Sequence, residues 1–142
     1  MKLFGKLLLA FSLLALPTIA QSDTTSTQDQ LTVQTIIKNQ ITAFLAEDSE
    51  AAFKFAAPNI KKVFPTADVF MDMVKRGYQP VYKPNQYRFG KTHRDDARIA
   101  QSVFIEDSQG IAYEAVYELR KQEDGRWLIS GVYLQKLPQT GA

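Results

Sequence analysis

The stretch IAYEAVYELRK, at residues 111–121, alternates between two kinds of residue. Its odd positions, from Ile111 to Leu119, are all apolar or aromatic, whereas its even positions include Glu114, Glu118 and Arg120. A period of two residues predicts a β-strand with one buried face and one solvated face. Antiparallel sheets are the ones that commonly keep a solvated face. The stretch therefore predicts an antiparallel sheet that is covered on one side only.

Three further strands are predicted around this one, at Gln86–Lys91, Ile99–Glu106 and Trp127–Leu137. Turn residues separate the last three strands, at positions 107–110 (DSQG) and 123–125 (EDG), and Asp-Gly is a strong hairpin signal. No helical pattern interrupts this part of the chain. It therefore predicts a meander of about four strands.

The chain before the sheet shows helical periodicity. Val33, Ile37, Ile41 and Phe44 fall on one face of a long helix that starts at Gln30. Helices that precede an antiparallel meander predict an α+β fold, with the helices packed on one face of a curved sheet.

Shorter helices are predicted after the long one. We expect Asp48 to cap a helix that Pro58 stops, and a helical turn at Asn59–Val63. We expect Thr66 to cap a helix over Ala67–Arg76, which ends at Gly77. Its predicted buried stripe is Val69, Phe70, Met73 and Val74. The segment Tyr78–Pro84 holds two prolines, so it is predicted to be extended.

Residues 1–20 are typical of a secretory signal peptide. Two lysines precede the apolar run Leu7–Leu16, and the small residues Thr18 and Ala20 precede a cleavage site before Gln21. The apolar run is too short to span a bilayer, so no stable membrane anchor is expected after cleavage. The polar segment 21–29 is predicted to be a flexible leader, and residues 30–138 to form a single domain.

Charge and cysteine content narrow the possible partners. The chain has 17 basic and 15 acidic residues, and removing Lys2 and Lys6 with the signal peptide leaves a neutral protein. A neutral protein gains little from counterion release, so we predict no nucleic acid partner. The absence of cysteine excludes disulfides and a lipoprotein anchor, and favours the bacterial periplasm as the compartment.

Three segments resemble a family of small exported proteobacterial proteins, the domain-of-unknown-function 4864 family. They are AAFKFA (51–56), MVKRGYQPVYKP (73–84) and DGRWLISG (124–131). The order of helices and strands is also similar to the nuclear transport factor 2-like (ketosteroid isomerase-like) fold. The resemblance covers about residues 30–137. It implies a cone-shaped domain, export and a homodimer through the sheet, and it supplies no catalytic residue.

The acidic residues and the single histidine, which could act in catalysis or bind a metal, stand where a solvent-exposed role is expected. Asp72 lies on the polar face of its helix, four residues before Arg76, so an exposed ion pair is expected there. His93, the only histidine, stands in a charged hairpin, and zinc prefers several His or Cys ligands. We therefore predict no catalytic residue, no metal site and no cofactor.

The tyrosines and their neighbours suggest a ligand pocket. We predict that Tyr113 and Tyr117 line it from the sheet and Gln40 from the long helix, with Arg88 as an anion anchor and Tyr82 at the crossing from helices to sheet. A buried phenol needs a partner for its hydroxyl, which a ligand could provide. The alternative is that these rings simply fill the core.

The sequence thus predicts an exported, non-catalytic module that binds a small apolar ligand or a partner. One alternative is a pocket enzyme of the isomerase or hydro-lyase type on a small apolar substrate, which would need a carboxylate of raised pKa inside the cone. A second is a partner-binding or inhibitory protein that uses an apolar patch of Phe104, Val116 and Val132 on the outer sheet face. A pocket smaller than about 300 Å³ would argue against both ligand hypotheses.

Export is testable on the mature protein. If residues 1–20 are a cleaved signal peptide, N-terminal sequencing of protein recovered from the native host will read from Gln21. A mature protein that starts at Met1 would contradict the prediction.

Overall fold

The computed structural model of the chain describes residues 22–140, and the predicted signal peptide lies outside them. The described residues form five helices followed by four strands: α1 (Ser22–Leu45), α2 (Ser49–Lys54), α3 (Pro58–Val63), α4 (Ala67–Gly77), α5 (Gln79–Tyr82), β1 (Gln86–Asp95), β2 (Arg98–Glu106), β3 (Ala112–Lys121) and β4 (Trp127–Lys136). No helix in this part of the chain combines the length and the apolarity needed to cross a membrane.

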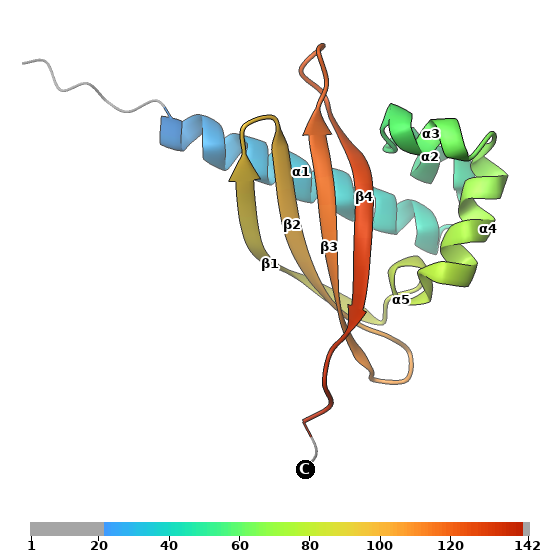
Figure 1. Cartoon of the computed structure of the whole chain (residues 1–142). Helices are drawn as coiled ribbons and strands as arrows, with labels where there is room; N and C mark the ends of the chain where they lie inside the picture. Colours follow the sequence, from blue (N-terminus) through green and yellow to red (C-terminus); the bar gives the residue numbers. More distant parts are fainter. Residues whose placement is uncertain (1–21, 141–142) are drawn as a thin grey trace, which may run out of the picture.

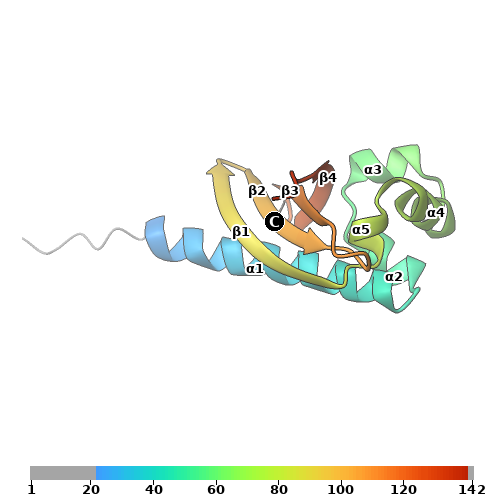
Figure 2. The same cartoon turned by 90° about the horizontal axis from the view of Figure 1, so that it is seen from below.

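The four strands form one antiparallel sheet in the order β1-β2-β3-β4. Helix α1 crosses one face of this sheet, and no helix of residues 22–140 covers the other face (Figure 1). Helices α2 to α5 gather at the side of the sheet that β4 borders, as both views show (Figures 1 and 2). The predicted α+β fold with helices on one face of a four-stranded sheet is confirmed.

The predicted faces of β3 and of α1 are confirmed. In β3, Ala115, Tyr117 and Leu119 are completely buried against the helix. In α1, Val33, Ile37 and Ile41 are completely buried, and Phe44 is 1% exposed. Burying an aliphatic side chain of this size stabilises a fold by about 1.5–3 kcal/mol, so this stripe is a major part of the core.

The predicted flexible leader is wrong from Ser22 onward, because α1 begins there. Asp29 is 9% exposed, and its carboxylate accepts hydrogen bonds from Arg94 Nη1 at 2.8 Å and from Trp127 Nε1 at 3.1 Å. Burial raises the pKa of the Asp29 carboxyl, but these two hydrogen bonds together with the positive charges of Lys121 and Arg94 outweigh it and hold the pKa below its ordinary value. The polar segment is helical for two reasons. Extending an existing helix requires no new nucleation step, and Asp29 forms hydrogen bonds with residues of the sheet.

The short helices follow the predicted caps but differ in their extent. Asp48 accepts from the Ala51 N–H at 3.0 Å, and Thr66 accepts from the Val69 N–H at 3.2 Å. Helix α2 ends at Lys54, before the predicted end, and Pro58 begins α3. Proline is favoured in the first turn of a helix because that position needs no N–H donor.

The buried face of α4 is rotated relative to the predicted stripe. Val69 is 42% exposed, whereas Met71 is 4% exposed and packs in the core. The observed stripe is Ala67, Phe70, Met71 and Val74.

The prediction that Tyr78–Pro84 is extended is wrong. Residues Gln79–Tyr82 form α5, a single helical turn with Pro80 in its first turn, where proline is tolerated.

Candidate functional site

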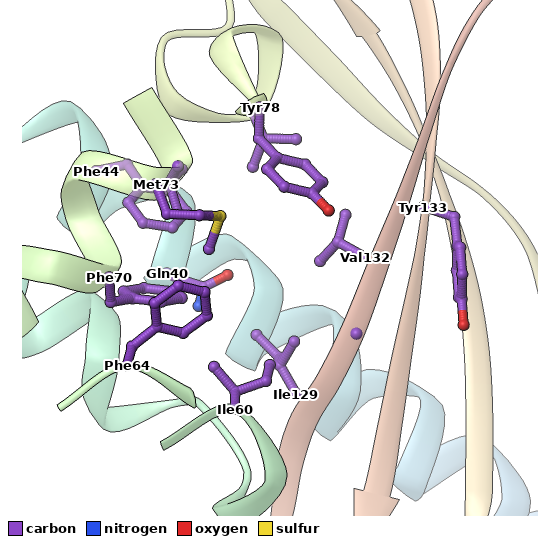
Figure 3. A pocket seen from close by; sticks show the side chains of 13 residues that line it. Gln40, Phe44, Ile60, Phe64, Phe70, Met73, Tyr78, Ile129, Val132 and Tyr133 are labelled. Atoms are coloured by element: carbon purple, nitrogen blue, oxygen red, sulfur yellow. The ribbon is translucent and has the colours of Figure 1, made fainter. Parts of the chain in front are cut away.

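An apolar hollow of about 270 Å³ lies between β4 and the helices beside it (Figure 3). Its lining comes from the end of α1, from α3 to α5 and from β4. The lining residues are Gln40, Phe44, Ile60, Phe64, Phe70, Met73, Val74, Tyr78, Val81, Ile129, Gly131, Val132 and Tyr133.

Backbone hydrogen bonds hold the helices alongside β4. Ala57 N donates to Ile129 O at 2.7 Å, and Ile129 N donates to Phe55 O at 2.8 Å, which makes a short parallel bridge. Asn59 Nδ2 donates to Ser130 O at 2.9 Å. The segment between α2 and α3 is thereby fixed to the start of β4, and the two walls of the hollow keep their spacing.

Aromatic rings support the helical wall. The Phe70 ring lies 6.3 Å from Phe44, 5.1 Å from Phe53 and 5.9 Å from Phe64, measured between ring centroids. The Phe64–Phe70 pair is edge to face, a favoured arrangement of two rings. Such a cluster presents a rigid, apolar surface to the hollow.

Two polar groups point into the hollow. Gln40 is 2% exposed, and its Nε2 donates to Ala52 O at 3.2 Å. Its Oε1 accepts no hydrogen bond from the described residues and faces the hollow (Figure 3). The Tyr78 hydroxyl also points inward and has no hydrogen-bond partner among those residues. The Tyr133 ring lies on the other side of β4 from the remaining labelled side chains.

The lining of the hollow contains no charged side chain and no imidazole, because none of its residues is Asp, Glu, His, Lys or Arg. Within residues 22–140, no group of three or more His, Cys, Asp or Glu side chains could hold a metal ion. The site can therefore offer apolar contact, an amide oxygen and a hydroxyl.

Of the five predicted pocket residues, only Gln40 lines this hollow. Arg88 and Tyr113 lie together in a second, more polar hollow of about 280 Å³, formed by the ends of β1, β2 and β3. The Arg88 guanidinium carbon stands 4.3 Å from the centroid of the Phe104 ring. That guanidinium is thus occupied by a cation–π contact on the outer face of the sheet.

Tyr117 belongs to the core. It is completely buried opposite Gln101 and Val132, and burial raises the pKa of its phenol. Its hydroxyl is the one buried side-chain N or O atom without a hydrogen-bond partner in the described part of the chain. It lines neither of the two hollows described here, so a ligand bound in either one would not contact this hydroxyl.

Tyr82 takes part in a cluster that joins α1 to α4 and α5. Its hydroxyl donates to the Glu47 carboxylate, which also pairs with Lys75 Nζ at 3.3 Å and Lys83 Nζ at 3.1 Å. The hydrogen bond from Tyr82, followed by that from Lys83, lowers the pKa of Glu47 from its ordinary 4.5 to about 2. Glu47 has a φ of 58°, the left-handed conformation that often ends a helix. The cluster fixes the helices that form one wall of the hollow.

The predicted outer-face patch is wrong in one member. Val132 pairs with Tyr117 and points into the hollow, on the helix side of the sheet. Phe104 and Val116 are half-buried on the opposite face. Glu114 accepts from the Ser102 hydroxyl at 2.7 Å on that face, so polar groups interrupt the patch.

Sequence reasoning missed most of the lining, although a signal for it was present. Two of the three segments that carry the family resemblance, residues 73–84 and 124–131, run along the hollow. They supply Met73, Val74, Tyr78, Val81, Ile129 and Gly131.

Fold and site together define an α+β domain with an apolar, uncharged hollow between an antiparallel meander and a group of short helices. Residues 26–142 match the family described as Domain of unknown function (DUF4864), and the chain belongs to this family. Neither a search of curated proteins nor a search of solved structures finds a match.

We expect Tyr117→Phe to leave the free energy of unfolding unchanged or to raise it by up to about 1 kcal/mol, because the change removes a buried hydroxyl that has no partner. Tyr82→Phe is the matched control and should lower stability, because it removes a hydrogen bond to a carboxylate. Chemical denaturation measures both variants. A loss of more than about 1 kcal/mol in Tyr117→Phe would show that its hydroxyl has a partner.

The lowered pKa of Glu47 predicts a pH dependence of stability. Between pH 4.5 and about 2 the unfolded chain binds this proton while the folded chain does not, so stability falls as the pH falls through this range. Glu47→Gln should flatten the fall, and the exposed Glu50→Gln should not. Thermal unfolding at low ionic strength, where screening is weak, measures the effect. Identical pH curves for wild type and Glu47→Gln would contradict the assignment.

Proposed function

We propose that this domain is a non-catalytic binding module whose hollow beside β4 takes a small, uncharged and mainly apolar ligand. The observation that carries the proposal is the lining itself. Side chains such as Phe70, Met73 and Ile129 surround a space that the buried Gln40 amide reaches from the end of α1. Ligand sites typically combine such an apolar lining with a few placed polar groups.

The size of the hollow restricts the ligand. Its volume of about 270 Å³ falls below the limit of about 300 Å³ named in the sequence analysis, so this criterion counts against both ligand hypotheses for ligands of drug size. A smaller ligand is still compatible with the hollow. An apolar cavity of about 150 Å³ suffices for benzene. We therefore propose a ligand of one or two rings, or an aliphatic group of similar bulk.

The lining favours binding over catalysis. An isomerase or a hydro-lyase moves a proton and needs a positioned acid or base. The hollow offers no carboxylate and no imidazole. The partner-binding alternative has weaker support, because Arg88 and Glu114 divide the apolar side chains of the outer face.

We also propose that the protein acts after export, in the bacterial periplasm. This proposal is supported by the pattern of residues 1–20 and by the lack of cysteine. The nuclear transport factor 2-like classification and a homodimer through the sheet rest on the resemblance and stay predictions.

Titration of the purified protein with toluene and indole, followed by backbone amide NMR shifts, tests the binding function. We expect shifts around Phe70, Met73 and Val132, with a Kd on the order of 1 mM for compounds of this size. Val132→Phe should abolish them, because the larger side chain fills the hollow. Val63→Phe is the control, because it makes the same change at a side chain that is 68% exposed and does not line the hollow. If neither compound shifts these amides, the proposal is wrong.

A further inference from the structure

We infer that the hollow is specific for an aromatic ligand that carries an N–H or O–H donor at its ring edge, of the indole or phenol type, and that Gln40 Oε1 accepts that hydrogen. The inference rests on the proposed function of the hollow as a ligand site.

The orientation of the Gln40 amide follows from its one hydrogen bond. The Ala52 carbonyl oxygen can only accept, so the amide nitrogen must face it, at 3.2 Å. The amide oxygen is then directed into the hollow (Figure 3). Gln40 as a whole is 2% exposed, but this oxygen is not fully enclosed by protein, and it accepts no hydrogen bond from the described residues. It is therefore an acceptor that the hollow leaves open to a ligand.

Gln101 is a second buried amide in this protein, and its role is structural, so its hydrogen bonds can be compared with those of Gln40. Gln101 is completely buried, and its Oε1 accepts from Thr92 Oγ1 at 2.6 Å and from Gln34 Nε2 at 3.2 Å. Its Nε2 donates to backbone carbonyls, among them that of Gly90 at 3.1 Å. Gln101 is satisfied on both sides, whereas Gln40 is satisfied only on the side that faces the protein. The open side of Gln40 is therefore the side that a ligand would complete.

The walls favour an aromatic ring over a chain. The rings of Phe64, Phe70 and Tyr78 and the thioether of Met73 are all directed at the same space (Figure 3). Aromatic rings stack or meet edge to face, and thioether sulfur makes favourable contacts with ring edges. A bicyclic ring of the indole type is compatible with a space of about 270 Å³.

The polar pattern requires a neutral ligand that donates. No cationic or anionic side chain lines the hollow, so a charged ligand would lose its hydration without a partner. A ligand that presented only an acceptor would place two lone pairs against each other at Gln40. The Tyr78 hydroxyl can donate or accept and can therefore pair with either kind of ligand, so the requirement for a donor rests on Gln40 alone.

The test compares indole with benzofuran, which has the same shape but an oxygen in place of the N–H group. Both are titrated into the purified protein while the amide shifts around the hollow are followed. We expect indole to bind at least about tenfold more tightly, because a site built for a donor is left unpaired by the analogue that lacks it. Gln40→Met should reduce the difference to about twofold or less, since methionine has a similar length but no amide. Gln135→Met, on the exposed part of β4, is the matched control and should keep the difference.

Each outcome has a separate meaning. Equal binding of the two compounds to the wild type, or tighter binding of benzofuran, would overturn the donor inference and leave the proposed function intact. Binding of neither would overturn both. An indole preference that persists in Gln40→Met would overturn the role of Gln40. If that variant does not fold, the comparison of indole and benzofuran on the wild type still decides whether the hollow selects a ligand with a hydrogen-bond donor.

Discussion

The fold and the hollow both depend on how α1 is held across the sheet. The apolar stripe from Val33 to Phe44 supplies the contact, and a carboxylate fixes the helix near each end. Asp29 binds Trp127 and Arg94 at the sheet, and Glu47, just after the helix, binds Tyr82 and two lysines at the helical side. Since the walls of the hollow come from α1, from the short helices and from β4, its shape is set by these contacts.

Periodic segments were predictable, because periodicity records which side of an element is buried. The alternation in β3 and the stripe of α1 both gave the correct face. The beginning of α1 was not predictable in this way, because its segment is polar. The order there depends on Asp29, whose partners Arg94 and Trp127 are 65 and 98 residues away in the chain. A local pattern carries no information about such a partner.

The candidate site was less predictable than the fold, for a related reason. Residues such as Tyr113 and Tyr117 were correctly placed on the apolar face of their strand, but a face does not show where along it the packing leaves space. The side chain of Tyr117, on β3, is completely buried in the core. The hollow lies elsewhere, between β4 and the short helices beside it. Of the five predicted pocket residues, only Gln40, which lies near the end of α1, lines the hollow.

An unpaired polar atom has a different meaning according to the space next to it. The Tyr117 hydroxyl has no partner among residues 22–140 and lines neither of the two hollows, so it is an unfavourable feature of a core that packing tolerates. The Gln40 oxygen also lacks a partner, but it borders a space that can hold one. Gln101 has the same side chain, similar burial and hydrogen-bond partners for both its oxygen and its nitrogen, so burial of an amide alone identifies no site. The combination of an unpaired acceptor with an adjoining apolar space distinguishes the Gln40 amide from the Gln101 amide, and it is the reason for proposing Gln40 as the ligand contact.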